Sequence, residues 1–168
     1  MSKAKKQRKK TSLSPSRVIK PDSAAVKPAS TLDIIQNRRS IRKFKTDIPT
    51  DADIENILEA ARWAPSGLNN QPWRFLVIQD KAIKGGLAQF TKYKTIIKEA
   101  PVLIAVCMDI TESYNRDKDL MAIGACIQNM LLDAYALGLG TCWLGEILNR
   151  KEEVSGFLKL SKDLLSLR

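Results

Sequence analysis

One stretch of this chain, residues 119–137, constrains the fold more than any other. It is long enough for about five helical turns, and its apolar residues lie on almost every side. A helix of that kind must be covered by other elements over most of its surface. Because Gln128, Asn129 and Asp133 interrupt the apolar pattern, the stretch predicts a buried central helix and not a membrane span.

Three shorter segments predict strands. Residues 74–79 predict a strand around the apolar run Phe75–Ile78, and residues 102–108 are a continuous apolar run, which is typical of a buried strand. Residues 141–145 predict a third, short strand that leads into an irregular loop. Strands and helices alternate without a run of hairpins, so the pattern indicates an α/β or α+β class, with a sheet covered by helices.

Further helices are predicted between these strands. Residues 50–53 form a capping sequence, and apolar residues follow at helical spacing as far as Arg62, which predicts a helix with one apolar face. A short helix is predicted around Leu32–Ile35, and others over residues 81–91, 93–99 and 151–160. The chain contains no internal repeat and no glycine fingerprint of a dinucleotide or triphosphate loop.

The composition divides the chain at about residue 30. Residues 1–30 contain nine Lys or Arg against one Asp, with three prolines and no apolar stripe. They predict a disordered basic arm, which either contacts an anionic surface or remains solvated. Residues 31–168 hold nineteen basic and seventeen acidic residues, and they predict a single domain. The arm has no apolar run of the kind found in secretory signals, so we expect a cytoplasmic protein.

Histidine is absent from the whole sequence, and the three cysteines have no Cys-x-x-Cys spacing. Metal binding is therefore poorly supported, and the odd number of cysteines favours a reducing compartment over a disulfide framework. The absence of His also excludes Ser-His and Cys-His nucleophile pairs. If the protein is an enzyme, we expect a bound cofactor to supply its chemistry, with no catalytic side chain.

Two polar clusters are candidate binding segments. Residues 64–73, Ala-Pro-Ser-Gly-Leu-Asn-Asn-Gln-Pro-Trp, combine a flexible Gly67 with several side-chain amides that suit the edges of a planar heteroaromatic ring. Residues 38–43, Arg-Arg-Ser-Ile-Arg-Lys, place four cations around one hydroxyl, which suits a phosphate monoester. The alternatives are a self-contained turn for the first cluster and a solvated basic patch for the second.

These clusters, taken together, resemble the nitroreductase family of flavin-dependent oxidoreductases. The resemblance covers residues 31–168 and rests on RRSIRKF at 38–44, APSGLNNQPWRFLVI at 64–78, EAPVLIAVCMD at 99–109 and IGACIQNMLLDAYALGLGTCWLG at 123–145. It implies an FMN-binding α+β fold with a mainly antiparallel central sheet covered by helices. It also implies a homodimer with flavin at the interface, in which residues 38–42 of one chain and the loop over residues 65–71 of the other share each flavin, and it implies NADH or NADPH as the hydride donor.

The resemblance also implies roles for individual residues. By position, Arg38 and Ser40 would contact the FMN phosphate with help from Arg39, and Arg42 would lie toward the pyrimidine edge. The ring would be contacted by two further groups, Pro65, Ser66, Gly67, Asn69 and Gln71 from the loop, and Leu144 and Gly145 from the turn. Glu146 would be adjacent. Trp73 and Phe75 are expected in the core or an interface, and Gln128 and Asn129 are expected to bond across helices.

The implied activity is the transfer of two electrons from NADH or NADPH, through the flavin, to a nitroaromatic, quinone or similar flat acceptor by a ping-pong mechanism. Other reactions on the same fold, such as desaturation or dehalogenation, remain open, as does a flavin binder without activity. The chain departs from the family at both ends. The arm over residues 1–30 is additional, and we expect the domain to lack the final strand and the C-terminal extension of its relatives.

Overall fold

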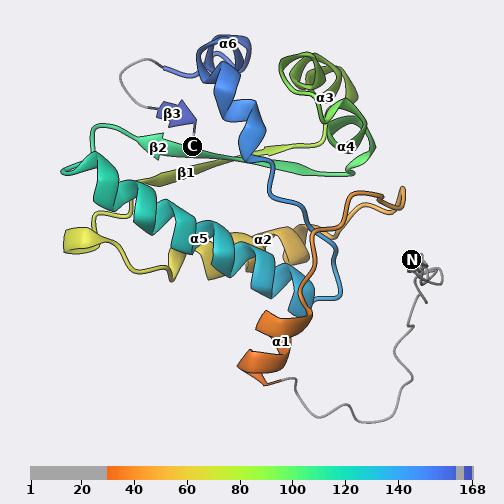
Figure 1. Ribbon diagram of the computed structural model, residues 1–168, viewed down its shortest axis with the longest axis horizontal. Coiled ribbons are helices and arrows are strands. Elements are labelled where there is room, and N and C mark those ends of the chain that lie inside the picture. The colour runs from red at the N-terminus through yellow and green to blue at the C-terminus, as the bar shows by residue number, and fades with distance from the viewer. Residues whose placement is uncertain (1–29, 162–164, 168) are drawn as a thin grey trace, which may run out of the picture.

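The computed structural model describes residues 30–161 and 165–167, and the predicted basic arm lies almost wholly outside them. Its centre is an antiparallel sheet of three strands in the order β1-β2-β3, formed by β1 (Trp73–Ile78), β2 (Leu103–Asp109) and β3 (Leu165–Leu167). β1 pairs with β2 from Trp73↔Met108 to Ile78↔Leu103. The helices cover both faces of the sheet (Figure 1), which confirms the expected α+β class.

The two faces of the sheet meet different helices. On one face, Ile104, Val106 and Met108 of β2 pack with Trp73 and with α2 (Asp51–Arg62) and α5 (Arg116–Ala136). On the other face, Leu103, Ala105 and Cys107 pack against α3 (Lys81–Leu87), α4 (Lys94–Glu99) and α6 (Lys151–Phe157). Alternate residues of β2 thus enter two separate cores. This explains why the strand reads as a continuous apolar run.

Local signals account for where the helices begin. Thr50 caps α2 by accepting from the N–H of Asp53, while the Asp53 carboxylate accepts from the N–H of Thr50, as the sequence predicted. Ser30 and Asp33 make the same reciprocal cap at α1 (Thr31–Asn37). The residues that the structure describes also include three short 3₁₀ turns, η1 (Gly67–Asn69), η2 (Ala88–Phe90) and η3 (Gly145–Arg150).

The long apolar stretch forms α5, which lies across one face of the sheet beside α2 (Figure 1). Its buried residues include Ala122, Ile123, Cys126, Ile127, Met130 and Ala134. The amide of Asn129 donates to the carbonyl of Ala60 on α2 at 3.0 Å, so this polar residue bonds across helices as expected. Gln128 is exposed and makes no such bond within the described residues. Among the helices of residues 30–161, none is both long and apolar enough to cross a membrane.

The structure differs from the sequence prediction in two strands. Residues 141–145 do not form a sheet strand; Thr141 makes a single parallel bridge with Ser40, and the chain then turns into η3. Conversely, we expected no final strand, yet Leu165–Leu167 pair with Cys107–Asp109. Within the described residues, Leu103–Val106 of β2 therefore have a strand partner only on the β1 side.

Candidate functional site

The segment that holds the predicted phosphate residues is fixed at the end of α1. The N–H of Arg38 donates to the carbonyl of Ile34, which closes the last turn of the helix at 3.0 Å. One residue beyond the bridge of Ser40 to Thr141, the N–H of Ile41 donates to the Thr141 carbonyl at 2.8 Å. The backbone of residues 38–41 is therefore held as an extended piece alongside Thr141.

The four candidate side chains of this segment differ in whether they already make hydrogen bonds. Arg39 folds back, and its Nη1 donates to the carbonyls of Gln36 at 2.6 Å and Arg38 at 3.0 Å. Arg42 Nη1 donates to the Ser40 carbonyl at 3.3 Å. Within the described part of the chain, the half-buried Arg38 guanidinium and the Ser40 hydroxyl have no hydrogen-bond partner. Both are free to bind an anion.

The turn at Leu144 and Gly145 follows directly from Thr141. Gly145 opens η3, so its N–H belongs to the first turn, where no acceptor of the same helix is available. Hydrogen bonds fix the side chain of Glu146. Its carboxylate accepts from the Thr91 hydroxyl and from the N–H of Lys92, the latter at 3.3 Å. The carboxylate of Glu146 therefore positions the turn.

A cavity of about 250 Å³ opens beside the same turn. Trp143 and Leu144 form part of its wall, and the remaining lining comes mainly from apolar side chains of β2, α4, α5 and η3. The turn thus combines a free backbone donor with an apolar surface, as a flat heteroaromatic ring requires.

The amide-rich loop has an unusual backbone. Leu68, Asn69 and Gln71 have φ values of 55°, 55° and 47°, in the left-handed region. For a residue such as Leu68 this conformation costs about 1–2 kcal/mol. Inside the loop, the N–H of Gln71 donates to the Ser66 hydroxyl at 3.0 Å, and the Gln71 amide donates to the Asn69 side-chain oxygen at 3.2 Å. Of the predicted ring contacts, Pro65 and Asn69 are exposed, while Ser66, Gly67 and Gln71 are half-buried.

Contacts with the start of α5 hold this loop in place. The Asn70 amide donates to the Glu112 carbonyl and to Asp119 Oδ1, each at 2.9 Å. Asp119 is completely buried, and its other oxygen accepts from the Ser113 hydroxyl at 2.6 Å. Burial alone would raise the pKa of Asp119, but the hydrogen bonds from Ser113 and Asn70 and from nearby backbone N–H groups bring it below the ordinary value.

The sequence placed Asn70 among the ring-suited amides of the loop, and it did not predict a role for Asp119. No local signal distinguishes Asp119, because the residues directly before it, Arg116–Lys118, are also charged. A second anchor holds the end of the loop. Arg74 donates to the Gln71 carbonyl at 3.2 Å and pairs with the buried Asp109 at 2.8 Å. Hydrogen bonds from Thr111 and the charge of Arg74 outweigh burial and lower the pKa of Asp109.

Gly67 is the closest point between the loop and the segment before α5. A Cβ atom at this position would lie 1.8 Å from Tyr114 Oη and 2.6 Å from Tyr114 Cζ. Only a residue without a side chain allows the ring to cover the loop this closely. The Tyr114 ring also lies under Lys118, whose Nζ is 5.4 Å from the ring centroid.

We expect Gly67→Ala to destabilise the protein by about 1–3 kcal/mol, because either Tyr114 or the loop must move. Urea unfolding measures the change. In the double variant Gly67→Ala/Tyr114→Ala the added methyl group no longer clashes with the tyrosine ring. Much of the destabilisation caused by Gly67→Ala should therefore disappear. Strictly additive effects of the two substitutions would contradict the contact.

The two halves of the candidate site lie far apart in one chain. Residues 38–41 lie beside Gly140 and Thr141, which follow the C-terminal end of α5, whereas the loop is bonded to Asp119 near its N-terminal end. Figure 1 shows α1 and the yellow loop at opposite ends of α5. From Asp119 to Ala136 the helix rises about 26 Å, more than the length of one flavin mononucleotide.

Comparison with known proteins agrees with the fold and with the order of these segments. Residues 35–167 match the model of the nitroreductase family. An Archaeoglobus fulgidus protein assigned as an NADH dehydrogenase/NAD(P)H nitroreductase is 36% identical over 130 residues, which cover 77% of this chain and 74% of the relative. A Thermotoga neapolitana iodotyrosine deiodinase is 31% identical over 134 residues, with 65% and 70% covered.

A solved structure shows the same architecture. It is a Desulfovibrio desulfuricans protein assigned as a nitroreductase, in complex with FMN. It is 46% identical, with a TM-score of 0.80, and the match covers 83% of this chain and 81% of that protein. On the family match and these identities, the chain belongs to the nitroreductase family.

Proposed function

We propose that this protein is an FMN-dependent oxidoreductase that takes two electrons from NADH or NADPH and passes them to a nitroaromatic, quinone or similar flat acceptor. One observation carries the proposal. The Arg38 guanidinium and the Ser40 hydroxyl bond to no group of residues 30–161, and they lie on the segment that runs beside Thr141, three residues before the turn whose Gly145 N–H has no acceptor in its own helix. The FMN complex of the Desulfovibrio desulfuricans relative supports the choice of cofactor.

The donor set fits FMN at both ends of the molecule. Arg38 and Ser40 would hold the phosphate, since a guanidinium and a hydroxyl supply charge-assisted and neutral hydrogen bonds to a dianion. Arg39 would add charge from its folded position on α1. Leu144 would pack on the ring, and the N–H of Gly145 would donate to it. Arg42 would add positive charge near the pyrimidine edge.

The remaining contacts would come from a second copy of the chain. The loop with Pro65, Ser66, Gly67, Asn69 and Gln71 is too far from Arg38 to reach the same flavin within one chain. Large apolar side chains are exposed near this loop: Trp63 is 79%, Leu68 85% and Met121 75% accessible. A two-fold dimer would cover this surface and complete each flavin site with a loop from the partner.

Bound FMN supplies the redox chemistry, accepting a hydride and passing on two electrons. The turn and the partner's loop would hold the ring between them, and apolar side chains such as Leu144 would keep water from one face. Arg42 would stabilise the negative charge of the reduced cofactor more than it stabilises the neutral oxidised ring. With no histidine in the sequence, these residues act by binding and charge, not as acids or bases.

The test of this function is a steady-state and single-turnover experiment. The purified protein should be yellow with FMN, and NADH or NADPH alone should bleach it. When the donor is varied at several acceptor concentrations, the double-reciprocal lines should be parallel, because the first product leaves before the acceptor binds. Intersecting lines, together with a flavin that neither nucleotide reduces, would contradict the proposal.

Reductive dehalogenation is the second candidate. It is favoured by the similarity to the Thermotoga neapolitana iodotyrosine deiodinase, at 31% identity. Both reactions use the same flavin site, so halogenated and nitro-substituted aromatic compounds should be compared as acceptors with one preparation. Faster oxidation of the reduced protein by the halogenated compound would favour this second function.

We also propose that the protein works in a reducing, cytoplasmic setting. Cys107, Cys126 and Cys142 are all free, and the first two are buried. Burial raises the pKa of Cys107 to about 11 and that of Cys126 to about 12, so both remain neutral thiols at physiological pH.

A further inference from the structure

We propose that the buried carboxylate of Asp119 is a positioning residue: through Asn70 it fixes the conformation of the loop Pro65–Gln71 and thereby sets the affinity for flavin. The inference rests on the proposed function for the flavin part alone. The loop part stands on contacts described above, between Asp119, Asn70 and Ser113. None of these three side chains is expected to touch the flavin.

Asn70 anchors the middle of the strained turn to the segment before α5 and to α5 itself. Asn70 itself is right-handed, with φ of −71°, while Leu68, Asn69 and Gln71 around it are left-handed. An amide nitrogen has two hydrogens, and Asn70 uses both, one toward the Glu112 carbonyl and one toward Asp119 Oδ1. Leu68 and Gln71 do not favour this conformation by themselves, so hydrogen bonds must hold it, and the two from Asn70 are the ones that tie the loop to residues 112–119.

Asp119 is suited to this task because it is itself held rigidly. It is completely buried near the start of α5, and Ser113 occupies its second oxygen. Residues 112–119 hold the loop at two points. Tyr114 packs against Gly67, and the Glu112 carbonyl accepts from Asn70. A buried carboxylate that loses its hydrogen-bond donors destabilises the protein. The contacts of Asn70 and Ser113 with Asp119 therefore stabilise one another.

The central variant is Asp119→Ala, which removes both acceptors. Amide hydrogen exchange of residues 66–71 in the flavin-free protein should become faster, because the left-handed residues relax. FMN affinity should fall about tenfold or more. Riboflavin affinity should fall by the same factor, because the loop faces the ring and not the phosphate.

Asp119→Asn is the conservative variant. Its side-chain oxygen can still accept from Asn70, and its amide can donate to the Ser113 oxygen, so exchange and flavin affinity should return most of the way to those of the unmodified protein.

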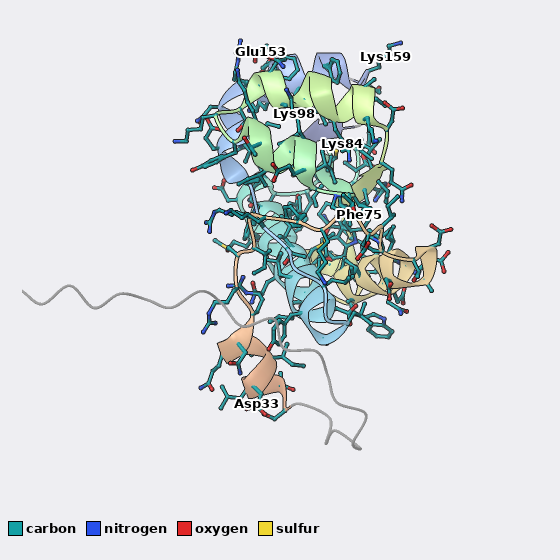
Figure 2. All side chains as sticks on the ribbon, turned by 90° about the vertical axis from the view of Figure 1, so that its right-hand side faces the viewer. Asp33, Phe75, Lys84, Lys98, Glu153 and Lys159 are labelled. Atoms are coloured by element: carbon teal, nitrogen blue, oxygen red, sulfur yellow. The ribbon has the colours of Figure 1, made fainter. Side chains whose placement is uncertain are left out.

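The matched control is Lys84→Ala. Lys84 is also buried, and its Nζ donates to the carbonyls of Ala100 at 2.7 Å and Pro101 at 3.1 Å. It belongs to α3, on the opposite face of the sheet from α5 (Figure 2).

The control separates positioning from a general loss of stability. Lys84→Ala should lower the midpoint of urea unfolding but leave loop exchange and flavin affinity unchanged. If Asp119→Ala leaves loop exchange unchanged, or if Lys84→Ala and Asp119→Ala weaken flavin equally, the inference is overturned. If the unmodified protein binds neither flavin, the proposed function fails together with the flavin part, and the exchange data alone decide whether Asp119 fixes the loop.

Discussion

Replacing Arg38 with alanine should weaken FMN binding about ten- to a hundredfold, because one charged hydrogen bond to a phosphate contributes about 1.5–3 kcal/mol. The structure gives a physical reason for choosing this arginine. Its guanidinium is half-buried and, within the described residues, bonds to no protein group, whereas Arg39 is tied to the carbonyls of Gln36 and Arg38. Fluorescence titration of the flavin-free protein measures the change.

Two controls make this result specific. Riboflavin lacks the phosphate, so its affinity should hardly change in Arg38→Ala. Lys43→Ala removes an exposed cation from the same segment, and it should weaken FMN only slightly, because an exposed charge is screened by solvent. Equal losses for FMN and riboflavin, or equal effects of the two substitutions, would show that Arg38 does not bind the phosphate.

A mixed dimer should regain the flavin site that each of its parents has lost. One parent is Arg38→Ala, and the other is Asn69→Ala/Gln71→Ala, which removes two side-chain amides that bond to each other in the loop. If each site combines residues 38–42 of one chain with the loop of the other, the mixed dimer has one site with both lesions and one with neither. It should therefore bind about one FMN per dimer with the unmodified affinity.

The experiment requires two different affinity tags, co-expression and isolation of the doubly tagged dimer. Titration of each parent alone should show weak binding at every site. Should both halves of a site come from the same chain, the mixed dimer would contain two weak sites and no tight one. That outcome would refute the shared site and leave the separation of Arg38 and Asp119 along α5 without a functional role.

The sequence predicted the elements whose signals are local. The cap at Thr50 and Asp53 and the helical spacing after it define α2, and the apolar runs define β1 and β2 to within a residue or two. These signals suffice because capping and side-chain periodicity depend on residues only a few positions apart. The family was also apparent from motifs that lie at fixed positions along the chain, as the family match over residues 35–167 confirms.

The strand predicted at 141–145 shows where local signals fail. An apolar run predicts burial, but a strand also needs a partner for its backbone groups, and Thr141 finds only Ser40 before the chain turns into η3. The same requirement explains β3. Leu165–Leu167 form a strand because the end of β2, at Cys107–Asp109, is available for pairing.

The sequence by itself determined the helices, the two long strands, the family and the types of residue that would bind a flavin. The roles of those residues remain predictions. Only the tertiary structure decided that Arg38 and the loop lie at opposite ends of α5, and that Asp119 is buried beneath Asn70, 49 positions earlier in the chain. The reason is physical: the environment of a carboxylate depends on which distant segments pack against it, and no local pattern records that packing.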